Sequence, residues 1–209
     1  GDPVMVSACE DDEEEAERIA VRISAMKFER RAQFADFAVL YRSNQQARLL
    51  EQALRKQHIP YTVTGGTSFF ERTEVRDLAA YLRLLVNDDD DPAFIRAVTT
   101  PRRGIGAATL ETLGALAGER QCSLLAALFE TAAESRLAAR QLAPLREFGA
   151  FIHRFAWRAE RETAAVVIDD LLAAIAYRDW LFDHEPDRQA SQRWQNVCEF
   201  VDWIKRRAE

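Results

Sequence analysis

Long apolar segments are absent from this sequence. No uninterrupted apolar run approaches the roughly 20 residues that a helix needs to cross a bilayer. The best candidate, residues 164–177, is broken by Asp169 and Asp170. The first residues also lack the basic, apolar and small-residue pattern of a signal peptide. These absences argue against a membrane protein and predict a soluble, cytoplasmic one.

Cysteine and histidine are scarce as well. The three cysteines, Cys9, Cys122 and Cys198, are far apart and form no Cys-x-x-Cys pair. Because an odd number of cysteines cannot all form disulfides within one chain, this usage is typical of a reducing compartment. The three histidines lack the carboxylate-rich spacing of a metal site, so a structural or catalytic metal ion is not expected.

Nucleotide-binding motifs are missing too. The sequence contains no Gly-x-x-x-x-Gly-Lys-Ser/Thr phosphate loop, and no pair of carboxylates suggests a magnesium site. Gly65 and Gly66 follow an expected strand but lack the other residues of such a loop, so they indicate a turn. The sequence therefore predicts no catalytic residue, no metal site and no cofactor site in this chain.

Charge is unevenly distributed along the chain, whose formal net charge is −6 at pH 7. Eight acidic residues lie within residues 1–17, and four more form the run Asp88–Asp91. Because the remainder is slightly basic, the net charge does not exclude a nucleic-acid partner. Asp88–Asp91 fits the cap of the helix that follows better than it fits a metal site.

The hydrophobic pattern divides the chain into two halves, residues 1–68 and 69–209. The first half alternates expected strands (4–9, 37–41 and 61–64) with expected helices (11–30 and 44–57). This order predicts a parallel sheet with right-handed crossovers. From Phe69 onward the strand signals vanish and helical patterns follow one another. The expected fold class is α/β followed by all-α.

The segment TTPRRGIGAATLETL, residues 99–113, joins two expected helices through a glycine hairpin. Glycines allow close approach of the backbone, and the N–H groups at the start of the second helix can donate to a phosphate oxygen. This helix-hairpin-helix arrangement predicts contacts with a DNA backbone, with charge from two arginines. The candidate residues are Thr100, Arg102, Arg103, Gly104, Ile105 and Gly106. The alternative is a tight turn with solvated arginines.

A second candidate is the segment YRSN, residues 41–44. Arg42 and Asn44 follow the carboxyl end of an expected parallel strand, where α/β sheets place their ligands. The alternative is that Asn44 only caps the next helix and Arg42 only lies on the surface.

Four long segments resemble the UvrD/Rep/PcrA helicases of superfamily 1, and the resemblance covers essentially the whole chain. They are AVLYRSNQQARLLEQAL, IPYTVTGGTSFFERTEVRDLAAYLRLL, NDDDDPAFIRAVTTPRRGIGAATL and YRDWLFDHEP. Within them, GGTSFF and YRDWLF favour the Rep branch. The resemblance implies that residues 1–68 are part of the RecA-like domain 2A and that 69–209 are an incomplete helical domain 2B, with a hinge near 69–76. A start without methionine and an end within a helix also lead us to expect a fragment of a larger protein.

The resemblance also implies a function. These bacterial enzymes hydrolyse ATP, with magnesium, to move 3′ to 5′ along single-stranded DNA and separate the duplex ahead. In them the YRSN segment faces the single strand and the GIG hairpin contacts the duplex, which implies the same roles for Arg42, Asn44 and Gly104–Gly106. Domain 2B swivels and restrains unwinding. The implied partners are a DNA junction, the remaining helicase domains and replisome proteins.

The family's Walker A lysine, magnesium-binding acids and phosphate-sensing arginines have no counterpart in this sequence. We therefore expect this chain alone neither to bind ATP productively nor to unwind DNA. The alternative function, from a different class, is a helical regulatory or protein-interaction module without DNA binding of its own.

Overall fold

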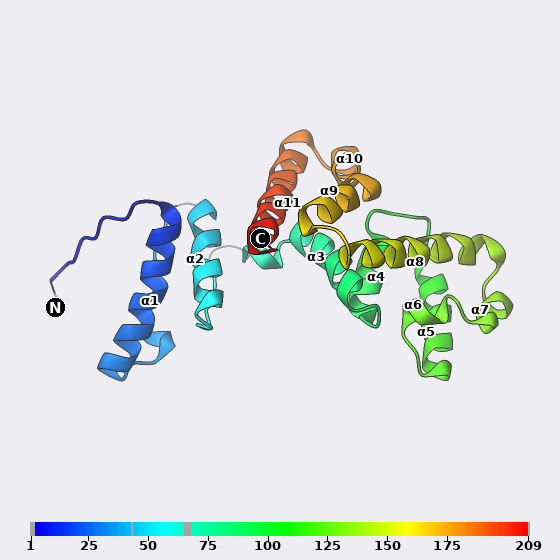
Figure 1. Cartoon of the computed structure of the whole chain (residues 1–209), viewed down its shortest axis with the longest axis horizontal. Coiled ribbons are helices and arrows are strands. Elements are labelled where there is room, and N and C mark those ends of the chain that lie inside the picture. The colour runs from blue at the N-terminus through cyan, green and yellow to red at the C-terminus, as the bar shows by residue number, and fades with distance from the viewer. Residues whose placement is uncertain (1–2, 43, 65–67, 209) are drawn as a thin grey trace. The chain divides into compact units, whose positions relative to one another are not determined.

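The computed structural model describes residues 3–42, 44–64 and 68–208, and the chain falls into two compact units, residues 1–72 and 73–209. Helices dominate both units (Figure 1). No helix in the described part of the chain is long and apolar enough to cross a membrane. Gly65 and Gly66, where the sequence predicts a turn, lie outside the described residues.

The first unit is built on two α-helices, and its described elements are α1 (Asp12–Arg30), η1 (Phe34–Asp36), α2 (Asn44–Lys56) and η2 (Phe69–Glu71). Helix α1 starts where the Asp11 side chain accepts a hydrogen bond from the Glu14 N–H, at 2.8 Å. Four acidic residues in its first turn favour the positive end of the helix dipole. The helix ends at Arg31, which adopts a left-handed conformation with φ of 54°.

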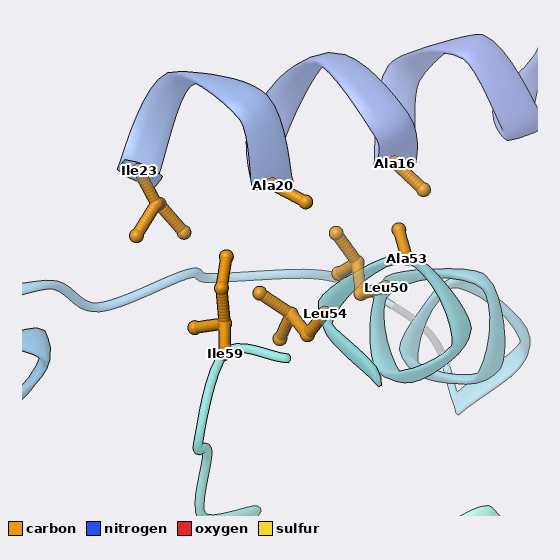
Figure 2. Packing of buried hydrophobic residues seen from close by; sticks show 7 residues of the cluster. All are labelled: Ala16, Ala20, Ile23, Leu50, Ala53, Leu54 and Ile59. Atoms are coloured by element: carbon orange, nitrogen blue, oxygen red, sulfur yellow. The ribbon is translucent and has the colours of Figure 1, made fainter. Parts of the chain in front are cut away.

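Apolar side chains at helical spacing pack α1 against α2. Figure 2 shows these residues of α1, α2 and the following turn: Ala16, Ala20, Ile23, Leu50, Ala53, Leu54 and Ile59. The small alanines let the two helices approach closely, while the larger residues fill the space between them. The core of this unit is therefore a helix–helix contact.

The sheet expected in residues 1–68 is not formed, so the predicted partial RecA-like parallel sheet is wrong. Residues 4–9, 37–41 and 61–64 run between or beside the helices, and no strand occurs among residues 3–42, 44–64 and 68–72. The exposed fractions of Val4 and Leu40 are 91% and 94%. A short apolar run favours a strand, but a strand also needs backbone pairing with a neighbour. The described fold is all-helical.

A buried carboxylate organises the end of the first unit. Glu51 of α2 is only 3% exposed, and its Oε1 accepts a hydrogen bond from the Phe69 N–H at 3.0 Å. Its Oε2 accepts from the hydroxyls of Tyr61, at 2.9 Å, and of Ser68. Arg55 Nε donates to the Tyr61 hydroxyl at 2.7 Å. Glu51 thus fixes η2 against α2 just before the boundary between the units.

The described part of the second unit is helical, as the sequence predicts for the chain after Phe69. Its helices are α3 (Thr73–Val86), α4 (Asp91–Thr99), α5 (Ala107–Arg120), α6 (Leu124–Ala127), α7 (Thr131–Arg136), α8 (Ala139–Ala159), α9 (Ala164–Ile175), α10 (Tyr177–His184) and α11 (Asp187–Ala208). Helix α3 packs against α4, α8 and α11 (Figure 1). Phe148 of α8 makes edge-to-face contacts with Tyr81 of α3 and Phe94 of α4.

Two buried carboxylates connect α3 to its neighbours. Asp77 accepts hydrogen bonds from Arg96 Nε of α4, at 2.7 Å, and from the Tyr177 hydroxyl of α10, at 2.8 Å. Glu74 accepts from Asn196 Nδ2 of α11, at 2.6 Å. Both acids are less than 5% exposed, and buried charges need such partners.

The acidic run before α4 caps that helix, as the sequence predicts. Asp90 Oδ1 accepts a hydrogen bond from the Ala93 N–H at 3.1 Å, and its Oδ2 lies 2.6 Å from Arg83 Nη2. Asp91 Oδ1 accepts from the Leu124 N–H at 2.8 Å and so joins α4 to the start of α6. These carboxylates act on helix ends and hold the approach to the hairpin in place.

Candidate nucleic-acid interface

Residues 100–106 form the connector between α4 and α5, so the expected helix, hairpin and helix are all present. Gly104 has φ of 72°, in the left-handed region that glycine adopts without strain. Gly106 is the N-cap residue of α5. A Cβ placed on either glycine would meet nothing within 4 Å. The glycines therefore face open space that a ligand can enter.

The start of α5 presents backbone donors to solvent. Gly106 has no side chain with which to cap the helix, while its carbonyl accepts from the Thr109 and Leu110 N–H groups at 3.1 and 3.3 Å. Ala107 and Ala108 are exposed, and the N–H groups of a first turn have no acceptor within the helix. These N–H groups and the positive end of the helix dipole can together bind an anion, to which the N–H groups donate, such as a phosphate oxygen.

The two arginines of the connector have different surroundings. Arg102 is exposed. Arg103 is half-buried, and its Nη1 donates to the carbonyls of Ala97 and Pro101, both at 2.9 Å. Its guanidinium lies 5.0 Å from the centre of the Phe148 ring. Arg102 can therefore reach a ligand, whereas the Arg103 guanidinium is directed into the protein.

The sequence predicts no role for Tyr81, but its buried side chain contacts the hairpin from inside the unit. Its hydroxyl accepts a hydrogen bond from Arg103 Nη2 at 2.7 Å and lies 2.8 and 2.7 Å from the carbonyls of Ala97 and Thr100, to which it donates. Burial raises the pKa of this hydroxyl to about 12, although Arg103 opposes the shift. Thr100 thus contributes its carbonyl to an internal contact, while Ile105 is half-buried on the connector.

The start of α8 lies beside the start of α5. Gln141 Nε2 donates to Thr109 Oγ1 at 3.1 Å, and Gln141 Oε1 accepts from the Ala138 N–H at the N-cap of α8. The N-terminal ends of α5 and α8, which are the positive ends of their helix dipoles, therefore lie close together. The exposed Arg140 adds a further positive charge.

The second pair of candidates belongs to the first unit. Arg42 is exposed, and its backbone N–H donates to Gln46 Oε1 of α2 at 3.0 Å. Arg42 also lines a concavity of about 780 Å³, whose other walls include Val39, Leu50 and Tyr61. Asn44 is the first residue of α2. Its side chain and Ser43 lie outside the described residues.

The residues do not fit an ATP–magnesium site. Among residues 3–42, 44–64 and 68–208, no group of three or more histidines, cysteines or acids is placed to hold a metal ion. The sequence likewise has no phosphate loop. The start of α5 instead presents backbone donors near the exposed Arg102, an arrangement that suits the binding of an anion.

Fold and site together define a helical protein with a helix-hairpin-helix module whose open side presents backbone donors. Residues 1–208 match the UvrD-like helicase C-terminal domain, and the chain belongs to this family. It is 41% identical to the ATP-dependent DNA helicase Rep of Salmonella typhimurium and 40% identical to that of Escherichia coli, over 98% of the chain in both cases. It is 34% identical to DNA helicase II of Escherichia coli over 96% of the chain. The predicted resemblance is confirmed.

The chain spans about a third or less of the relatives that it matches. It covers 30% of each of the two Rep sequences and 28% of DNA helicase II. The comparison therefore covers only one part of each of these longer proteins.

Proposed function

We propose that this chain is the part of an ATP-dependent 3′-to-5′ DNA helicase that contacts the DNA backbone and regulates unwinding. The observation that carries the proposal is the open start of α5, where Gly106 leaves the first N–H groups uncapped beside the exposed Arg102. Such contacts bind phosphate without reading bases, as a helicase that acts on any sequence requires.

The hairpin supplies the duplex contact in this proposal. The Ala107 and Ala108 N–H groups and the Arg102 guanidinium bind phosphate oxygens, while Gly104 and Gly106 allow the DNA backbone to come close. Ile105 lies between the glycines on the same connector. Arg103 and the carbonyl of Thr100 support the hairpin from inside, since both are hydrogen-bonded within the unit.

The first unit supplies the single-strand contact, through Arg42 and Asn44. The exposure of Arg42 and its place in the wall of the concavity support this assignment. We assign residues 1–68 to domain 2A and 69–209 to domain 2B, with a hinge in 69–76. The division of the chain between residues 72 and 73 supports a hinge in this segment.

ATP hydrolysis belongs to the rest of the parent enzyme in this proposal, because the sequence has no phosphate loop and the described residues present no metal-binding group. The names of the matched relatives, ATP-dependent DNA helicases, support such a parent. The partners of the chain are then a duplex with a single-stranded tail and the remaining helicase domains, with replisome proteins as further candidates. The chain alone is inactive as a helicase.

The test is fluorescence anisotropy of a duplex with a 3′ single-stranded tail at low salt, comparing the parent chain with Gly106→Asp. Gly106 has extended backbone angles (φ −90°, ψ 164°) and free space around it, so aspartate fits and should cap α5 well. The same carboxylate repels phosphate. We expect unchanged or raised thermal stability and at least a roughly tenfold loss of affinity.

Ser123→Asp is the matched control, because it adds the same charge at the N-cap of α6, where Ser123 already accepts from the Ala126 N–H. Arg102→Gln tests the side chain: the slope of log affinity against log salt should become shallower by about 0.9, and Arg120→Gln at the far end of α5 should leave it unchanged. If Gly106→Asp binds as well as the control, the hairpin is only a turn and the chain is better explained as a regulatory or protein-interaction module.

A further inference from the structure

We propose that Tyr81 and Arg103 are positioning residues that hold the hairpin in the conformation that binds phosphate. This inference rests on the proposed function. It reassigns Arg103, whose adjacency to Arg102 suggests a direct contact with DNA, to the interior of the protein. We call these two side chains the hairpin latch.

Arg103 binds the end of α4 and the start of the connector that follows it. Its Nη1 donates to the Ala97 carbonyl in the last turn of α4 and to the Pro101 carbonyl in the connector. The last carbonyls of a helix have no partner within it, and a cation there also favours the helix dipole. The planar guanidinium has donors in a fixed fork, so it can hold two carbonyls and a hydroxyl at once.

Tyr81 connects this turn to the core. The residue is 0% exposed and belongs to α3, the helix that packs against α4, α8 and α11. Its hydroxyl bonds to Arg103 and to the carbonyls of Ala97 and Thr100, between which its single hydrogen is shared. The raised pKa keeps this hydrogen in place through neutral and moderately alkaline pH. One buried side chain thus fixes the end of α4 and the start of the connector.

The latch leaves the opposite side of the hairpin free. Because Arg103 is committed inward, the exposed Arg102 and the open space at Gly104 and Gly106 form the outer side. A glycine-containing loop that is already ordered loses less conformational entropy when DNA binds than a mobile one. The latch therefore strengthens binding without touching DNA.

A direct phosphate contact by Arg103 makes a different prediction from the latch. Lysine is a point charge that still binds phosphate, but it lacks the guanidinium fork. Arg103→Lys should therefore retain most of the affinity if Arg103 touches DNA and lose it if Arg103 acts through the turn. Tyr81→Phe removes the hydroxyl without any change of charge, so it tests the latch separately from electrostatics.

The experiment has two readouts on Tyr81→Phe and Arg103→Lys. The first is the position and hydrogen exchange of the Gly104 and Gly106 amide signals in ¹⁵N NMR spectra without DNA. The second is anisotropy with the tailed duplex. Tyr177→Phe is the control, because it removes another buried hydroxyl of the same unit, one that bonds to Asp77.

We expect the glycine signals to shift and exchange faster in both latch variants, and affinity to fall about tenfold, the size of a hydrogen bond to a charged group. The control should change neither. Unchanged glycine signals would overturn the latch whatever happens to DNA binding. Shifted signals with unchanged affinity, or full affinity in Arg103→Lys, would overturn its role in binding. If the unsubstituted chain binds no DNA, the proposed function fails, and the role of the latch in DNA binding fails with it. A shift of the glycine signals in the variants would still support the contact between the latch and the hairpin.

Discussion

Removal of the Asp77 carboxylate should destabilise the second unit more than any single exposed change. Asp77 is 3% exposed and joins three helices, because it accepts from Arg96 of α4 and from Tyr177 of α10 while it belongs to α3. In Asp77→Ala the Tyr177 hydroxyl stays buried without its acceptor. Arg96 keeps its charge without a counter-ion, although its side chain is 31% exposed and water can partly solvate it.

The magnitude follows from these two losses. Breaking a buried ion pair by removing one partner costs about 3–5 kcal/mol, and partial solvation of Arg96 places the pair at the lower end of that range. The orphaned hydroxyl adds about 1 kcal/mol. We therefore expect the free energy of unfolding to fall by about 4 kcal/mol, against at most about 0.5 kcal/mol for Asp179→Ala, an exposed change on α10.

Tryptophan fluorescence is the appropriate probe for urea unfolding, because all four tryptophans lie between residues 157 and 203. The signal therefore reports on the second unit alone, even where the two units unfold separately. A change of midpoint with an unchanged slope would mean a change in stability rather than in the extent of unfolding.

The pair of Asp77→Ala and Tyr177→Phe tests the reasoning further. Tyr177→Phe alone should lower the free energy of unfolding by about 1 kcal/mol, since Asp77 keeps Arg96. The double variant should be about as stable as Asp77→Ala or slightly more so, because the orphaned hydroxyl is gone. Strict additivity, or a loss below about 1 kcal/mol for Asp77→Ala, would refute the claim that this carboxylate ties the helices together.

Two further predictions concern glycine and pH. Gly149→Ala should lower the free energy of unfolding of the second unit by about 1 kcal/mol, because the new Cβ lies 3.0 Å from the Phe129 ring and 3.3 Å from Leu128. Gly118→Ala, with open space on an exposed face of α5, should raise it by up to about 1 kcal/mol; urea unfolding that gives both changes the same sign would contradict this. Burial raises the pKa of Tyr81 to about 12 in the folded state from 10.0, so its contribution to stability is complete below about pH 10 and is lost as pH rises to about 12. A difference titration of tyrosinate absorbance between the parent chain and Tyr81→Phe would contradict this if the Tyr81 step occurred near pH 10.

The helices could be predicted from sequence because their signals are local. Acidic first turns, apolar residues at helical spacing and the cap at Asp90 all act within a few residues, and the structure has α1, α2 and α4 where these signals place them. The expected strands failed because a sheet depends on partners that no local pattern guarantees. Residues 4–9 and 37–41 are short apolar runs of the kind found in strands, but they have no backbone pairing among the described residues.

The candidate site divides in the same way. The glycine hairpin and the start of α5 follow from a motif of a few residues, and both are present. The different surroundings of Arg102 and Arg103 could not be predicted, because two adjacent arginines look alike in a sequence. What separates them is Tyr81, which precedes them by about 20 residues and reads as one more apolar position on the buried face of α3.

A hairpin that binds only the DNA backbone needs a fixed shape more than it needs particular side chains, and helix α3 is where that shape is stabilised. Glu74, Asp77 and Tyr81 follow one another at spacings of three and four residues, so they lie along one face of the helix. Glu74 bonds to α11, Asp77 to α4 and α10, and Tyr81 to the connector. Each of these polar groups is buried, and each would be costly to leave without its partner. The packing of the second unit and the conformation of its hairpin therefore depend on the same helix, and in the proposed function the residues that position the hairpin for a phosphate include some that never reach the surface.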